Sequence, residues 1–353
     1  MSRFAMEPDI IDLATQLGLG GAADPVVAIL DSCRRRIDRW VAEVGGISSI
    51  ERLEALVAGK LQMFFEEIRS EADFARIKDV YAAGKRDAVF AAMKMKFEDE
   101  GNPTYGALVR RKNVADDAPD RYVAVIDCRG DKLHRRFFTR WHEIAHRLTT
   151  HADLDEPVYR SEHDPLEQMM DRVASHVGFY EPLFGPAFDR EMVGRSKLTF
   201  EVVELIRRRA FPEASFQSAL VACHRRLAEP AVYLEASEAF KAEDRREINR
   251  GRQWLIEDLR PVPELRAVKV FPNDAAKLKG LFIIPKMRIP ESSQVHRIFC
   301  DDTLASGVTS ENLGQWEHSG GKRLADQDVW VEARKARDRV IALVQAIPVG
   351  TDL

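Results

Sequence analysis

The chain has 353 residues, of which 45% are hydrophobic and 31% charged, and its formal net charge at pH 7 is -4. This length allows two domains with separate cores, and the negative charge argues against general affinity for nucleic acid. No run approaches the roughly 18 apolar residues of a membrane span, and the opening MSRFAMEPDIIDLA lacks the apolar core of a signal peptide. We therefore expect a cytoplasmic protein without a membrane partner, whose cysteines are reduced thiols.

The region from residue 25 to residue 97 has the periodicity of helices. Apolar residues recur at helical spacing in three runs: Val26, Leu30, Cys33 and Ile37; then Leu53, Leu56 and Val57; then Leu61, Phe64 and Phe65. A further run covers residues 87–97, and Gly101-Asn102-Pro103 breaks the pattern. Two strands are predicted next, from Tyr105 to Arg110 and from Tyr122 to Asp127, as an antiparallel hairpin.

The most informative motif is His142-Glu143-Ile144-Ala145-His146. Histidines at positions i and i+4 lie on one face of an α-helix, where both imidazoles can bind a single Zn²⁺. Glu143 would then lie beside the metal and could accept a proton from a zinc-bound water, whose pKa the metal lowers to about 7. The short motif also occurs by chance, so a zinc site requires a third ligand elsewhere in the chain.

A second helix supplies a candidate for this third ligand. Asp164 is a good N-cap and Pro165 a good first helical residue, so a helix is predicted with Glu167 and Asp171 on one face. Glu167 could complete the zinc coordination, and Asp171 could accept the free ring N–H of a ligand histidine. The Asp-x-x-Glu pattern is also typical of a helix N-terminus without any metal.

HExxH followed by a Glu-x-x-x-Asp helix resembles the gluzincin arrangement of thermolysin-like peptidases. The stretch from Tyr122 to Phe184 is similar, more specifically, to the ImmA/IrrE metallopeptidases. These have a strand, an Arg-Arg-Phe-Thr-type lead-in, HExxH with a further histidine, and a helix of the form Glu-x-x-Ala-Asn-x-Phe-Ala. Here Arg135-Arg136-Phe137-Phe138-Thr139 matches the lead-in and His151 the further histidine. Met170 and Val173 depart from the helix pattern. For His151 we favour a structural or outer-shell role over zinc binding.

The resemblance implies an α+β fold with a helix-rich, thermolysin-like minimal zinc peptidase domain that contains a small antiparallel sheet. In peptidases of this type, a strand ahead of the zinc helix pairs with the extended substrate. The resemblance also implies the substrate, a helix-turn-helix transcriptional repressor whose single cleavage derepresses a stress-response or mobile-element operon. By analogy, the layout is similar to the members that accompany bacterial antiphage defence operons.

Beyond the second zinc helix, two helices are predicted, from Phe200 to Arg209 and from Ser215 to Leu227, and then a long charged helix from Glu235 to Leu259. Pro261 and Pro263 mark a domain boundary, which gives a peptidase domain at 1–260 and a small α/β domain at 261–353. In the latter we expect strands and a closing helix, in the order Val268 to Phe271, Leu281 to Ile284, Val295 to Cys300, Val329 to Val331, and the helix Glu332 to Ile347. The resemblance suggests a GAF-like regulatory domain at this position.

Several residues are candidates for roles around the zinc site. Glu143 would take a proton from the polarised water and deliver it to the leaving amine, and a donor besides zinc would stabilise the oxyanion. Tyr159, His163 and His176 are the candidates for this donor, and the sequence does not choose among them. Cys128 follows the strand that precedes the zinc helix, so its thiolate could occupy the fourth zinc position and keep the enzyme latent. The alternative for Cys128 is a small hydrophobic residue at a strand end.

A conditional peptidase would also need an effector. Single-stranded nucleic acid is the first candidate and a small molecule the second, and charge and stacking for a strand could come from Lys286, Arg288, His296, Arg297 and Phe299. Two other functions stay open. One is a zinc-bearing regulator that binds a repressor without cutting it, and the other is a DNA-binding transcription factor that uses the helices between Phe200 and Leu227.

Overall fold

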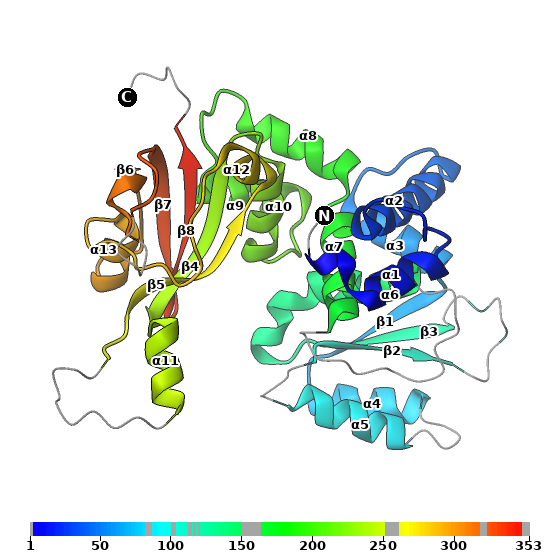
Figure 1. Ribbon diagram of the computed structural model, residues 1–353. Helices are drawn as coiled ribbons and strands as arrows, with labels where there is room; N and C mark the ends of the chain where they lie inside the picture. Colours follow the sequence, from blue (N-terminus) through cyan, green and yellow to red (C-terminus); the bar gives the residue numbers. More distant parts are fainter. Residues whose placement is uncertain are drawn as a thin grey trace. The chain divides into compact units, whose positions relative to one another are not determined.

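The computed structural model describes residues 3–81, 87–99, 104–111, 115, 118, 121–149, 164–250, 261–317 and 323–347. The fold is α+β, with a helix-rich N-terminal region around a small mixed sheet and a five-stranded antiparallel sheet toward the C-terminus (Figure 1). The chain divides into two compact units: unit 1 is Met1–Glu191 with Glu204–Ala219, and unit 2 is Met192–Val203 with Leu220–Leu353. In the described part of the chain, none of the helices combines the length and apolar character needed to span a membrane.

Unit 1 begins with helices whose starts are set by local signals. The first elements are η1 (Arg3–Met6), α1 (Pro8–Gln16), α2 (Pro25–Glu43) and α3 (Ile50–Lys60). Asp24 caps α2 by accepting hydrogen bonds from the backbone N–H groups of Val26 and Val27, and Ser49 caps α3. The helical prediction for α2 and α3 is confirmed.

The prediction of a helix around Leu61, Phe64 and Phe65 is wrong, because Met63–Ile68 forms strand β1. β1 pairs in parallel with β3 (Tyr122–Asp127), which in turn pairs antiparallel with β2 (Gly106–Arg110). The hairpin prediction is confirmed, but the sheet is mixed, with the order β1-β3-β2. Every residue of β3 is buried, as expected for a central strand.

The two faces of this sheet carry different helices. Ala107, Val109, Val123 and Val125 point to one face and pack against α4 (Glu71–Tyr81) and α5 (Asp87–Phe97). The alternate residues face the opposite side, where α6 (Arg136–Thr149) lies across the sheet (Figure 1). The short helix η2 (Gly130–Arg135) connects β3 to α6. Helices α7 (Pro165–Gly178) and α8 (Glu181–Met192) follow.

Unit 2 is built on the sheet β5-β4-β8-β7-β6. Its strands are β4 (Ala231–Ala239), β5 (Glu264–Pro272), β6 (Ser306–Asn312), β7 (Asp328–Ala336) and β8 (Arg339–Ala346). One face packs against α12 (Asp274–Lys279), α13 (Gln294–Cys300) and the short η4 (Leu313–Gln315) through a continuous apolar core. On the other face, the side-chain amide of Gln345 bonds both the N–H and the C=O of Leu198, so the segment before α9 lies on the sheet.

Several C-terminal predictions are wrong. Residues 235–239 belong to β4, and the helix that follows is the short α11 (Ala242–Asn249). Residues 281–284 join no sheet, residues 295–300 form most of helix α13, and residues 332–347 form most of the β7–β8 hairpin. The boundary expected at residues 260 and 261 falls between β4 and β5, which pair with each other.

The two helices predicted after α8 are confirmed as α9 (Phe200–Ala210) and α10 (Phe216–Arg226). The strands predicted around residues 268–271 and 329–331 lie within β5 and β7.

Candidate metal centre

Helix α6 presents its two histidines because its opposite face is buried. Trp141, Ile144 and Ala145 are completely buried, which fixes the rotation of the helix about its axis. Helix α7 packs against α6, and Gly178 allows the close approach, because a Cβ at this position would lie 3.0 Å from the Trp141 ring. The side chain of Asp164 caps α7 by accepting a hydrogen bond from Leu166 N–H, as the sequence predicted, and this places Glu167 in the first turn.

The structure brings His142, His146 and Glu167 together as one group of candidate metal ligands, whose ligand atoms lie within 4.8 Å of one another. The Nε2 atoms of the two histidines are 3.1 Å apart, and Oε2 of Glu167 lies 3.1 Å from Nε2 of His142 and 3.6 Å from Nε2 of His146. Ligand atoms at about 2.0–2.1 Å from a tetrahedral Zn²⁺ are roughly 3.3 Å apart. The three atoms therefore fit three corners of a zinc coordination sphere, and no other described residue belongs to the group that would fill the fourth.

Asp171 lies where an outer partner of a metal ligand is expected. Its Oδ1 is 2.8 Å from Nδ1 of His142, while Nε2 of the same ring faces Glu167. Because one ring nitrogen is engaged by a carboxylate, the other is left to bind a metal with its lone pair. The arrangement follows from helix geometry, since Glu167 and Asp171 are one turn apart on the same face of α7.

The charges of the group are strongly coupled. Burial lowers the pKa of His142, but hydrogen bonds with Asp171 and Glu167 outweigh burial and raise this pKa to about 10. Burial raises the pKa of Glu167, but the two histidines hold it well below its usual range. Glu167 is therefore an anion and an effective ligand for a cation.

Glu143 occupies a different environment from Glu167. Its side chain is 4% exposed, and burial raises its pKa, although His146 and His142 act in the opposite direction. A carboxylate with a raised pKa is a stronger proton acceptor than an exposed glutamate. Glu143 is not part of the ligand group, which is consistent with the role of a base rather than a ligand.

The sequence did not identify Gly106 as part of this site. A Cβ at this position would lie 2.5 Å from Oε1 of Glu143 and 2.7 Å from Cγ2 of Thr139. A glycine at the start of β2 therefore lets the carboxylate of Glu143 approach the backbone of the strand. Only the folded structure shows this proximity, because the two residues are far apart in the chain.

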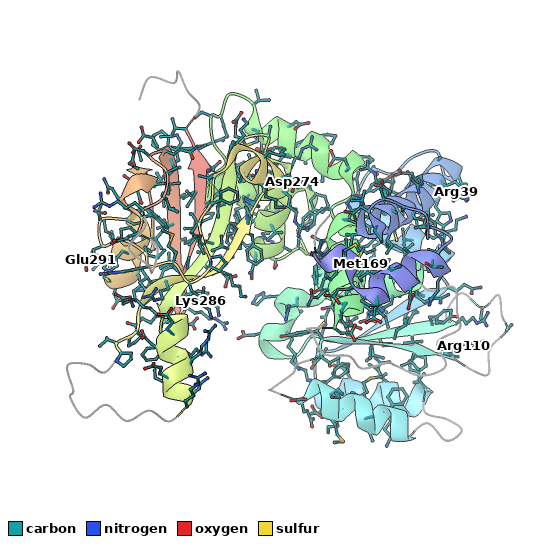
Figure 2. All side chains as sticks on the ribbon, viewed as in Figure 1. Arg39, Arg110, Met169, Asp274, Lys286 and Glu291 are labelled. Atoms are coloured by element: carbon teal, nitrogen blue, oxygen red, sulfur yellow. The ribbon has the colours of Figure 1, made fainter. Side chains whose placement is uncertain are left out.

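The substrate strand was expected at Tyr122–Asp127, but β3 is central and both of its edges are occupied by β1 and β2. Among the described strands, β2 pairs with β3 alone. The N–H groups of Asp127 and Arg111 bond the carbonyls of Tyr105 and Arg121, both at 2.8 Å. Hydrogen-bonded positions alternate in an antiparallel pair. Gly106, Leu108 and Arg110 therefore direct their N–H and C=O groups away from β3, and Arg110 marks the far end of this edge (Figure 2).

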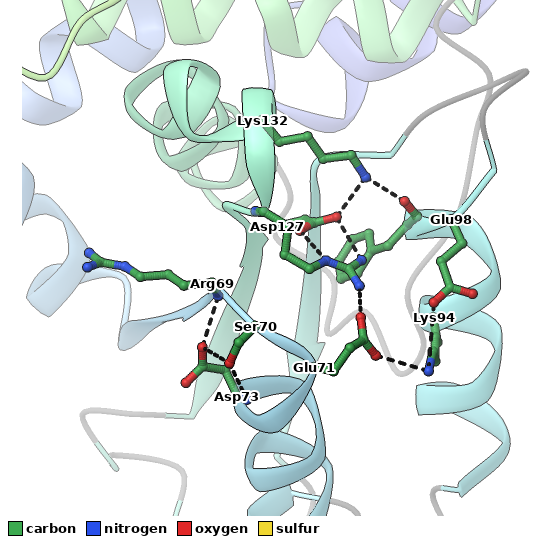
Figure 3. A network of polar contacts seen from close by, with 10 residues as sticks. Arg69, Ser70, Glu71, Asp73, Lys94, Glu98, Asp127 and Lys132 are labelled. Atoms are coloured by element: carbon green, nitrogen blue, oxygen red, sulfur yellow. Dashed lines mark hydrogen bonds and ion pairs between the residues drawn. The ribbon is translucent and has the colours of Figure 1, made fainter.

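A network of ion pairs holds the connection between β3 and α6 (Figure 3). Asp127 is buried at the end of β3, with its carboxylate bonded by Arg129 at 2.9 and 3.0 Å and by Lys132 at 2.7 Å. Arg129 also pairs with Glu71 at the start of α4, and Glu71 pairs with Lys94 of α5 at 3.1 Å. The network thus ties η2, which leads into the metal-binding helix, to the two helices beneath the sheet.

Of the three candidates for the oxyanion donor, the structure describes His176 alone. His151, Tyr159 and His163 lie outside the described residues. His176 follows Glu167 by nine positions, or two and a half helical turns, so it lies on the opposite face of α7 and the oxyanion-donor role does not fit its position.

Cys128 is buried, and its Sγ is not among the ligand atoms that lie within 4.8 Å of one another. Burial and the neighbouring charge of Glu67 raise its thiol pKa to about 11, against the effect of Arg136. Its surroundings are thus β1 and the start of α6, and the geometry gives no support to a fourth, inhibitory zinc ligand.

No protein-family model matches the sequence, and no curated protein matches it. The evidence for a metal site is therefore the geometry of His142, His146 and Glu167.

Proposed function

We propose that the chain is a zinc-dependent endopeptidase of the HExxH type. The observation that carries the proposal is the group of His142, His146 and Glu167, with Asp171 bonded to His142 and Glu143 beside the group. Four features of a hydrolytic zinc site coincide here: three protein ligands, a fourth position that no further described residue fills, an orienting carboxylate and a separate base. A structural zinc site would use all four positions for protein ligands and would not need Glu143.

The residues of the chain have distinct parts in the proposed hydrolysis. A bound Zn²⁺ would polarise a water molecule and the scissile carbonyl. His142, His146 and Glu167 hold the metal, and Asp171 orients the ring of His142. Glu143 takes a proton from the attacking water and gives it to the leaving amine. Burial raises the pKa of this carboxyl, so it accepts a proton from the water more readily than an exposed glutamate would.

The edge of β2 supports a peptide as the substrate. An extended peptide could add to this edge and bond the outward backbone groups of Gly106 and Leu108. Its backbone would then run past Glu143, because Gly106 brings the strand within van der Waals distance of that carboxylate.

The resemblance to the ImmA/IrrE metallopeptidases supports a narrower proposal. In this proposal the substrate is a helix-turn-helix repressor in the cytoplasm, its cleavage derepresses a stress or defence operon, and unit 2 has a regulatory role.

The test combines metal analysis with proteolysis of a quenched fluorogenic peptide library by the zinc-loaded full chain. We expect cleavage by the parent and by the control Glu51→Gln, a substitution at an exposed glutamate of α3. Glu143→Gln should retain one zinc per chain and lose cleavage, whereas His146→Ala should lose both. Zinc binding without cleavage of peptides or of a partner repressor would instead favour a non-proteolytic regulator. Zinc-independent binding to duplex DNA would favour a transcription factor.

A further inference from the structure

Unit 2 contains four consecutive apolar residues, at 281–284, that join none of the described strands. Leu281 and Ile283 are buried in the core of the unit, whereas Phe282 is 54% exposed and Ile284 is 40% exposed. The alternation is that of an extended chain, in which successive side chains point to opposite sides. Two large apolar side chains, Phe282 and Ile284, therefore face outward on the same side of this segment.

These outward side chains line a pocket of about 340 Å³. The opposite wall comes from the segment before β7, with Leu324, Arg323 and Gln327, and Leu313 of η4 contributes a buried apolar surface. Pockets that bind small molecules have volumes of about 300–1,000 Å³ and combine apolar walls with a few polar groups. The pocket of unit 2 meets both criteria at the small end of the range.

The one charged group among the described residues that line the pocket is the guanidinium of Arg323. Several other basic side chains of unit 2 are paired, as Arg288 is with Glu264 at 3.4 Å and Arg339 with Glu235 at 2.8 Å. Among the described residues Arg323 forms no ion pair within 4.0 Å, and Glu317 lies opposite it in an isolated antiparallel β-bridge. Arg323 is exposed, and its guanidinium carries a planar fork of N–H donors that matches the two oxygens of a carboxylate.

We propose that this pocket binds a small organic anion with an apolar body, of the class of aromatic or branched-chain carboxylates. Its carboxylate pairs with Arg323, and its apolar body lies between Phe282, Ile284 and Leu324. Arg323 is the one cationic side chain among the described residues that line the pocket, which matches one negative charge rather than the several of a nucleotide or nucleic acid. None of the residues suggested for strand binding, Lys286, Arg288, His296, Arg297 and Phe299, lines it.

The test uses two fluorescent probes that differ by one charge, anilinonaphthalene sulfonate and its uncharged parent phenylnaphthylamine, titrated into the full chain. The sulfonate stands in for the carboxylate. We expect one saturable site for the anionic probe. Arg323→Gln should weaken the anionic probe by roughly tenfold, the effect of one charged hydrogen bond, and leave the neutral probe unchanged. Phe282→Ser should weaken both probes.

Two matched substitutions control for general surface effects. Leu278→Ser removes an apolar side chain on α12 that is 87% exposed. Arg297→Gln removes an exposed arginine on α13. Neither residue lines the pocket. Both variants should bind the probes as the parent does. The proposal is overturned if no saturable site exists, if Phe282→Ser binds like Leu278→Ser, or if Arg323→Gln binds like Arg297→Gln. These measurements require no proteolysis, so their result is independent of the proposed peptidase function.

Discussion

Gly106 and Glu143 are in contact although they belong to different elements. A Cβ on Gly106 would lie 2.5 Å from Oε1 of Glu143, closer than any two such atoms can approach. The carboxylate is buried between α6 and the start of β2, so it has little freedom to move away. The glycine therefore determines where the proposed base can lie relative to the metal ligands.

Gly106→Ala should reduce peptide cleavage by at least about a hundredfold, since a displacement of the base by about 1 Å has this order of effect. Zinc content should not change, because the added methyl group meets Glu143 and Thr139 rather than a ligand. The control is Gly59→Ala in α3, where a Cβ meets nothing within 4 Å. That variant should keep full activity and gain about 0.5–1 kcal/mol of stability. Full activity of Gly106→Ala would exclude a positioning role for Gly106.

Asp171→Asn tests the outer partner of the site. The carboxylate orients the imidazole of His142 through the 2.8 Å contact between Oδ1 and Nδ1. Loss of such a partner typically weakens metal binding by about 10–100-fold, and we expect this range in competition titrations with a zinc chelator. Asp12→Asn, at an exposed position on α1, should have the affinity of the parent. Equal zinc affinities of the two variants would show that Asp171 does not affect zinc binding.

The sequence predicted the ligand group well because its geometry is local. The spacing of His142 and His146 is a property of one helix, and Asp164 and Pro165 placed the start of the second helix correctly. The contact between Gly106 and Glu143 could not be predicted in the same way, since it depends on how β2 packs against α6.

The failures in the fold also have local causes. Three apolar residues around Phe64 are too few to distinguish the 3.6-residue period of a helix from the 2-residue period of a strand. The segment forms a strand because it pairs with β3. In the β7–β8 hairpin, by contrast, the alternation of apolar residues in the sequence was sufficient to predict a strand. Val329, Val331 and Ala333 alternate with less buried residues, and Arg337, with a φ of 57°, turns the chain into β8. The strand prediction for residues 295–300 was wrong because it did not use the helix-start signal of Ser293. The side chain of Ser293 accepts a hydrogen bond from Val295 N–H at the start of α13.

Asp127→Asn should destabilise unit 1 by roughly 2 kcal/mol, because the basic groups of Arg129 and Lys132 lose a buried counter-charge. Burial raises the pKa of Asp127, but the bonds from Arg129 and Lys132 outweigh it and lower the pKa below its ordinary value. A carboxyl with a lowered pKa stabilises the fold above its unfolded pKa of about 3.9, and this contribution is lost as the pH falls through the folded value.

Chemical denaturation should therefore show a large difference in the free energy of unfolding between variant and parent at pH 7 and a smaller difference below pH 4. Asp79→Asn, on the exposed face of α4, is the control that should match the parent at both pH values. A difference that does not depend on pH would show that packing, not charge, makes Asp127 important.

His224 should make the stability of unit 2 depend on pH in a different window. Burial lowers its pKa to about 4, against a backbone hydrogen bond in which the Nε2 of the ring lies 3.0 Å from the carbonyl oxygen of Ala231. The unfolded chain, with a histidine pKa of about 6.5, takes up the proton first. Stability should therefore decline as the pH falls from about 6.5 to about 4, by up to roughly 3 kcal/mol, and this decline should level off below that window.

In His224→Gln the decline should be absent, although the variant is less stable than the parent at pH 7. His134→Gln, at an exposed position in η2, should retain the decline of the parent. Denaturant titrations at half-unit pH steps measure these curves, and an undiminished decline in His224→Gln would assign the pH dependence to another group.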